Sequence, residues 1–249
     1  MERIVRQARE VGTSSGVLLP RKWLGKQVVV TLAFPSEKEI AEEAFRILLE
    51  KNLNKEIKGL YFAGSYARGE QDFDSDIDIL AITGSTNKLV RHENYEILLV
   101  SEKSFQKKLP SSLLYLSMLR ESKPILNKEL LEEYKSGKTN FNYKEKVVEI
   151  KKVLAINKDA IKSCRELQKK VLDGIIYSLV LRLKELWLMK CISKEKAYSK
   201  KEFAKIIGSD AYSAYTRVKQ ERKEQKIISA QEAEKLIGLS EKWLGELRR

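Results

Sequence analysis

Residues 64–80 read GSYARGEQDFDSDIDIL, a stretch that links two apolar runs of the chain. A Gly-Ser pair follows directly on the first run, residues 57–63, and two aspartates enter the second. Side chains two residues apart on a strand point to the same face of the sheet. We therefore predict that Asp76 and Asp78 project together from the start of a strand, while the intervening Ile77 faces a core.

The residue types at the two ends of this stretch indicate a chemistry. Paired carboxylates at this spacing suit a divalent metal held by oxygen ligands. A Gly-Ser turn that opens a helix suits a phosphate, because the free backbone N–H groups and the helix dipole point at it. A phosphate site beside a metal site indicates phosphoryl or nucleotidyl transfer, in which metal ions bridge the phosphate and the attacking oxygen.

The order Gly-Ser, ten residues, Asp-x-Asp resembles the signature of the polymerase-β-like nucleotidyltransferase superfamily. The Ala-Arg-Gly-Glu of residues 67–70 and the serine at position 75 resemble its minimal nucleotidyltransferase branch in particular. This resemblance implies an α+β fold, with a mixed sheet flanked by helices. It also implies Mg²⁺, with Mn²⁺ as an alternative, and a nucleoside triphosphate (NTP) as substrate, with ATP the first candidate although no residue of the motif reads a base.

The same resemblance assigns roles to individual residues. Asp76 and Asp78 are expected to be catalytic and to hold the metal. Gly64, Ser65 and Arg68 are expected to bind the nucleotide, although a salt bridge to a neighbouring aspartate is a competing role for the arginine.

A third carboxylate is expected in this superfamily, on a strand beside the pair. Its usual form is an aspartate before an apolar run, and Glu96 has the matching place before residues 97–100. There it would complete the metal site and act as the base that takes the proton of the attacking hydroxyl. An exposed strand residue is the alternative interpretation of Glu96, and Glu93 is a weaker substitute.

Three segments are predicted along the chain. Residues 1–34 form a small β module that ends in an alternating, β-branched strand over 27–34. Residues 36–140 form the nucleotidyltransferase domain, which begins with a helix capped by Ser36 and by a glutamate three positions later. Residues 143–249 form a basic helical domain.

The first segment resembles a second family. Glycines, an apolar triplet, a proline and a tryptophan over residues 11–28 resemble a swapped-hairpin module of the AbrB type. That resemblance implies a homodimer and, in many members, DNA binding through basic side chains, for which the candidates are Arg3, Arg6, Arg9, Arg21 and Lys22. A hairpin extension packed on the main domain is the alternative.

The charge of the chain is concentrated in its last segment. Residues 1–142 hold 22 Lys and Arg against 20 Asp and Glu, whereas residues 143–249 hold 26 against 15. A basic surface indicates a polyanionic partner such as nucleic acid. Tyr212, Tyr215, Arg217 and Lys219 share one predicted helix and are candidate contacts by charge and stacking. A solvated helix with core tyrosines is the other interpretation.

Several classes of function are disfavoured by what the chain lacks. Its two cysteines have no metal-type spacing, and its single histidine excludes His-rich zinc sites and disfavours a Ser-His-Asp hydrolase. The last segment has no histidine, so a ribonuclease of the HEPN type is not expected. No apolar run approaches the ~20 residues of a membrane span, and we expect a cytoplasmic protein without membrane contacts.

Two functions follow as hypotheses. The first is Mg²⁺-dependent transfer of a nucleoside monophosphate from an NTP to an acceptor hydroxyl on RNA, protein or a small molecule. The second is a DNA-binding regulator or antitoxin of a toxin–antitoxin pair, with a non-catalytic transferase fold and a protein partner. The two are compatible, and the intact Gly-Ser and Asp-x-Asp elements favour the enzyme.

Overall fold

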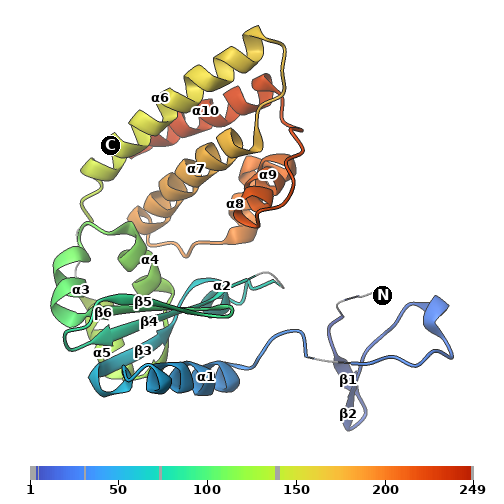
Figure 1. Cartoon of the computed structure of the whole chain (residues 1–249), viewed down its shortest axis with the longest axis vertical. Helices are drawn as coiled ribbons and strands as arrows, with labels where there is room; N and C mark the ends of the chain where they lie inside the picture. Colours follow the sequence, from blue (N-terminus) through green and yellow to red (C-terminus); the bar gives the residue numbers. More distant parts are fainter. Residues whose placement is uncertain (1–3, 5, 31, 73–74, 138–140, 248–249) are drawn as a thin grey trace.

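The computed structural model describes residues 4, 6–30, 32–72, 75–137 and 141–247. A five-stranded sheet lies at the centre, with helices on both faces and a group of helices beyond one of them (Figure 1). Its strand order is β5-β6-β4-β3-β7, and only β4 and β6 run parallel among these neighbours. The strands are β3 (Ile57–Phe62), β4 (Ile77–Thr83), β5 (Lys88–His92), β6 (Tyr95–Ser101) and β7 (Lys123–Leu126). The predicted α+β class with a mixed sheet is confirmed.

One face of the sheet is covered by α1 (Glu37–Glu50). The helix begins at Ser36, whose side chain and that of Glu39 form the predicted capping box. Its buried residues Ile40, Ala44 and Ile47 recur at helical spacing and pack against alternate residues of β3, β4 and β6. Apolar residues at alternate positions of β4 and at helical spacing on α1 thus pack together in one core.

The opposite face carries three short helices, which pack on the other alternate residues of the strands. These helices are α3 (Glu102–Lys108), α4 (Leu113–Glu121) and α5 (Lys128–Ser136). Phe105 is fully buried between Tyr115 and Tyr134, with ring centroids 5.5 and 5.1 Å away. The short α2 (Gly64–Arg68) follows β3, and η2 (Asn54–Glu56) precedes it.

The last part of the described chain is helical, as predicted, and has its own core. It contains α6 (Lys144–Glu166), α7 (Asp173–Ser193), α8 (Lys200–Ile207), α9 (Ser209–Lys219) and α10 (Ala230–Glu246). Helix α7 lies among the others, and its residues Leu179, Leu183 and Leu186 are fully buried. None of the described helices is both long and apolar enough to cross a membrane.

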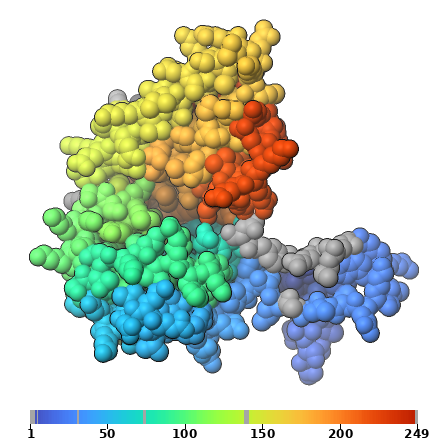
Figure 2. Space-filling view, viewed as in Figure 1, coloured from blue at the N-terminus to red at the C-terminus, as the bar shows by residue number. Residues whose placement is uncertain are grey.

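The N-terminal residues form a separate small lobe beside the sheet (Figure 2). It contains a hairpin of β1 (Arg9–Val11) and β2 (Ser14–Gly16), followed by η1 (Arg21–Trp23). The strand predicted over residues 27–34 is wrong, because the described residues of that range form no strand. An extended, β-branched run becomes a strand only when a neighbouring strand takes its backbone hydrogen bonds, and none in the described chain does so.

A buried ion pair ties the helical part together. Arg217 of α9 donates two hydrogen bonds, of 2.8 and 3.0 Å, to Asp173 at the start of α7. The backbone N–H of Gln225 donates a third at 3.1 Å. The Asp173 side chain is 1% exposed and that of Arg217 10%. The arginine holds the pKa of Asp173 below its usual value.

We predict that Arg217→Met lowers the free energy of unfolding by about 3–5 kcal/mol, because it leaves a buried carboxylate without its counterion. Urea unfolding followed by circular dichroism measures this loss, with Arg165→Met as the control, since Arg165 is 70% exposed in its ion pair. A loss below about 1 kcal/mol for Arg217→Met would contradict the assigned role.

Candidate functional site

The two aspartates lie where the sheet meets the helical part. Ile77 and Ile79 of β4 are fully buried in the core beneath α1, so Asp78, between them, faces the other side. Asp76 directly precedes the strand. Both carboxylates line a cavity of about 1010 Å³ between the sheet, α2, α4, α7 and α9. The predicted common projection of the pair is confirmed.

Gly64 lies against Asp78 and explains why the turn begins with glycine. Its φ is +63°, in the left-handed region that other residues rarely adopt. A Cβ at this position would lie 2.0 Å from Asp78 Oδ2 and 3.0 Å from Asp78 Cβ. Rotation of the aspartate cannot relieve the second contact. The glycine therefore lets the α2 turn approach the carboxylate closely, and Ser65 lines the same cavity.

Glu96 occupies the matching place on the neighbouring parallel strand. In the register of β4 and β6, Asp78 lies beside Glu96. The Glu96 side chain accepts a hydrogen bond of 2.7 Å from Arg91 Nε on β5 and also lines the cavity. Glu93, in contrast, lies exposed in the turn between β5 and β6. Of the two glutamates, only Glu96 is brought to the aspartates.

The electrostatic environment of Asp78 disfavours its charged form. Burial raises its pKa to about 6, and the negative charges of Glu96, Asp76 and Glu121 add to the effect. The ammonium of Lys219 acts in the opposite direction. In the described part of the chain, the carboxylates of Asp76, Glu96 and Glu121 thus repel that of Asp78 at the cavity.

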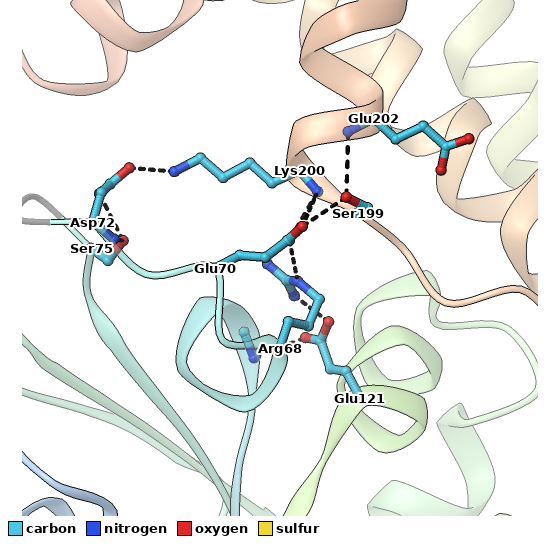
Figure 3. A network of polar contacts seen from close by, with 9 residues as sticks. Arg68, Glu70, Asp72, Ser75, Glu121, Ser199, Lys200 and Glu202 are labelled. Carbon is cyan, nitrogen blue, oxygen red and sulfur yellow. Dashed lines mark hydrogen bonds and ion pairs between the residues drawn. The ribbon is translucent and has the colours of Figure 1, made fainter. Parts of the chain in front are cut away.

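Arg68 is held by two acids at the edge of this group (Figure 3). Its Nε lies 3.1 Å from Glu70 Oε2, and its other end pairs with Glu121 at the end of α4. Glu121 also accepts a 2.9 Å hydrogen bond from the Gly64 N–H. Glu121 therefore engages two of the groups assigned to the nucleotide. Sequence reasoning missed it, since a glutamate at the end of an ordinary helix carries no motif.

Glu70 and Asp72, which follow α2, form hydrogen bonds and an ion pair with the helical part (Figure 3). Glu70 accepts hydrogen bonds from the Ser199 hydroxyl at 2.7 Å and from the Lys200 N–H at 2.9 Å, at the start of α8. The Lys200 ammonium pairs with Asp72. One interpretation of the sequence expected Arg68 to pair with Asp72 or Asp74. Arg68 pairs with Glu70 and Glu121 instead of Asp72, and Asp74 lies outside the described residues.

The basic helix of the last segment has a role that composition did not reveal. Lys219, at the end of α9, reaches over to Asp76, with 3.4 Å between the ammonium and Oδ2. Arg217, expected on the same basic surface, is instead buried with Asp173, so it is not available as a nucleic-acid contact. Tyr215 stacks on Tyr177 at 5.3 Å within the helical part.

The carboxylates suit a metal in type but do not converge on one point. No group of three or more His, Cys, Asp or Glu in the described ranges is arranged to hold a metal ion. Glu96 is drawn toward Arg91, and Asp76 toward Lys219. The donor set consists of oxygens, which Mg²⁺ prefers, and the mutual repulsion at Asp78 is relieved by a cation.

We predict a stability effect of Asp78 that depends on pH. Its pKa is about 6 in the fold against an ordinary 3.8, so the folded state binds this proton more tightly than the unfolded state. Stability should therefore fall as pH rises between these values, and the ionised carboxylate should cost up to about 3 kcal/mol at pH 7. Asp78→Asn removes that cost.

Urea unfolding of the metal-free protein at pH 4 and pH 7 measures this cost of the ionised Asp78. The stability of Asp78→Asn relative to wild type should increase between pH 4 and pH 7, whereas the exposed Asp159→Asn control should show no such change. Parallel pH profiles of Asp78→Asn and wild type would contradict the assigned environment.

Comparison with known proteins adds a family match. Residues 41–178, more than half of the chain, match the family model described as "Nucleotidyltransferase domain". The match runs through the sheet and α6 into the first turns of α7. Among solved structures, a nucleotidyltransferase-like protein from Exiguobacterium sibiricum 255-15 is 17% identical, with 83% of this chain and 75% of that chain covered and a TM-score of 0.31. No curated protein matches the chain.

Proposed function

This chain belongs to the nucleotidyltransferase domain family, and we propose that it transfers a nucleoside monophosphate from an NTP, with ATP the first candidate, to an acceptor hydroxyl. The observation that carries the proposal is the register of β4 and β6, which sets Asp78 beside Glu96 at the cavity, next to the Gly-Ser turn. Family membership supports transferase chemistry in general. The assignment of residues to roles is our own.

In this proposal, Asp76, Asp78 and Glu96 hold Mg²⁺ or Mn²⁺. The cation, when bound, would neutralise the triphosphate and the developing charge on the pyrophosphate that leaves. Asp78 has to be ionised to hold it, which its pKa of about 6 permits at neutral pH. Glu96 takes the proton of the attacking hydroxyl.

Gly64, Ser65 and Arg68 receive the phosphates. The Gly64 N–H and the Arg68 guanidinium are engaged by Glu121, so the nucleotide has to displace this carboxylate. A phosphate makes the same charge-assisted hydrogen bonds with more negative charge, which favours the exchange. Glu121 thus keeps the donors oriented until the nucleotide binds.

We predict that Asp76→Asn/Asp78→Asn abolishes the Mg²⁺-dependent part of NTP binding without unfolding the chain. Isothermal titration with each of the four NTPs, with and without Mg²⁺, measures it, and circular dichroism checks the fold. Transfer of a labelled nucleotide should fall by about 10²- to 10⁴-fold, since a metal contributes several kcal/mol to such a reaction.

Asp159→Asn, an exposed change on α6, is the matched control and should bind as wild type does. Retained Mg²⁺-dependent binding in the folded double variant would overturn the assignment of the pair. Failure of the wild type to bind any NTP would support the alternative of a non-catalytic fold in a regulator or antitoxin.

For residues 1–34, we propose a dimerisation module of the AbrB type, which also offers its basic side chains to DNA. Of the candidate contacts, Arg3 lies outside the described residues. The exposure of its apolar side chains supports this. Val29 is 90% exposed, Leu32 86% and Leu24 85%, although each is apolar. A second copy of the chain would bury them and give the described residues of the 27–34 run, which form no strand, a partner strand.

We predict that Val29→Lys/Leu32→Lys converts a dimer into a monomer, because two charges would enter the proposed interface. Size-exclusion chromatography with light scattering measures the mass. Leu167→Lys, at a residue 63% exposed between α6 and α7, is the control and should remain dimeric. A monomeric wild type, or a dimer unaffected by the double change, would contradict the proposal.

A further inference from the structure

Among the residues that the structure describes, five cationic side chains line the cavity, and four of them have a carboxylate partner. Lys219 pairs with Asp76, and Lys200 pairs with Asp72. The other two pairings involve Arg68, with Glu70 and Glu121, and Lys146, with Glu149 and Glu185. The fifth is Lys184 of α7.

Lys184 forms no hydrogen bond or ion pair with any residue that the structure describes. The Lys184 ammonium lies over the ring of Tyr198, 5.9 Å from its centroid. The same ring takes the Arg68 guanidinium at 5.1 Å. Lys184 therefore lies near Arg68, and both side chains line the same cavity, Lys184 from α7 and Arg68 from α2.

Its surroundings make a lone ammonium costly. Lys184 directly follows the fully buried Leu183 on α7, a helix with a buried apolar face. Burial lowers its pKa, and the positive charges of Arg68 and Lys219 add to the effect. The opposing charges of Glu121 and Asp78 act on it without forming an ion pair. The side chain is partly buried. A charge that is partly removed from water and has no hydrogen-bonded partner among the described residues is unfavourable, so an anion from outside the chain would stabilise it.

Resting on the function proposed above, we propose that Lys184 of α7 binds the phosphate tail of the NTP from the helical part of the cavity. An ammonium offers three donors and no acceptor, and it makes strong hydrogen bonds to phosphate oxygens. With Arg68 it would place two cations on one polyphosphate. This makes Lys184 a nucleotide-binding residue supplied by α7.

The test uses inorganic tripolyphosphate without metal, so that its result does not depend on the aspartate pair. Lys184→Met keeps the length of the side chain and removes the charge. We expect the Kd of tripolyphosphate to rise about 10- to 100-fold, the usual worth of a hydrogen bond to a charged group. The control Lys162→Met, at a lysine 74% exposed on α6, should stay within about twofold of wild type.

Two further measurements separate the explanations. Thermal unfolding of Lys184→Met should show an unchanged or higher Tm, since the change removes no hydrogen bond or ion pair to a described residue and relieves the repulsion from Arg68 and Lys219. A lower Tm with unchanged tripolyphosphate binding would overturn the proposal in favour of a structural role. A single-stranded oligoribonucleotide serves as the second probe. Weakened binding of that probe alone would overturn the assignment to the nucleotide and indicate an acceptor phosphate.

The same titration on Asp76→Asn/Asp78→Asn distinguishes this proposal from the proposed function. That variant lacks two repelling charges, so it should bind tripolyphosphate at least as tightly as wild type. If NTP transfer is absent but the Lys184 effect persists, the phosphate site stands and the transferase assignment fails. If transfer occurs and Lys184→Met binds as wild type does, the Lys184 proposal fails alone.

Discussion

The alternation of side chains along β4 is the constraint on which the rest of this structure depends. Ile77 and Ile79 have to be buried under α1, and this forces Asp78 onto the opposite face, below the helical part. A slip of one residue would turn Asp78 toward the core beneath α1 and turn Ile77 and Ile79 away from that core. The register with β6 then brings Glu96 alongside, and the missing Cβ of Gly64 lets α2 lie against Asp78. The site is therefore a consequence of how the sheet is buried.

Charge is distributed across the cavity in a corresponding way. The sheet side and α4 contribute carboxylates, of which Asp78 is the most perturbed. The helical part contributes the lysines, with Lys219 from α9 and Lys184 from α7. At the cavity, the sheet side has an excess of negative charge and the helical part an excess of positive charge. The two parts therefore attract each other there. Some of the basic residues of the last segment thus serve to balance the aspartates.

Sequence predicted the parts of this protein that local rules determine. The capping box of α1, the strand β4 and the glycine of α2 follow from periodicity, hydrogen-bond chemistry and the motif. The short strands β5 and β7 were not predicted, because their pairing with β6 and β3 is set by tertiary contacts. The same holds for Glu121 and Lys184, which reach the cavity only through the packing of α4 and α7. In the opposite case, a strand was predicted over residues 27–34 from β propensity, and the described residues of that range form none, because propensity alone does not make a strand.

The bond between Glu70 and the start of α8 has a consequence for how substitutions combine in this chain. Glu70 accepts from the Ser199 hydroxyl, 129 residues away in sequence, while it also pairs with Arg68. A substitution of Glu70 or of Ser199 changes the position of Arg68 and also the packing of α8 against the sheet side. Natural variation at these two positions should therefore be correlated, and energies of paired changes should not add. Glu70 thus connects the sheet to the helical part and also contacts a residue of the candidate site.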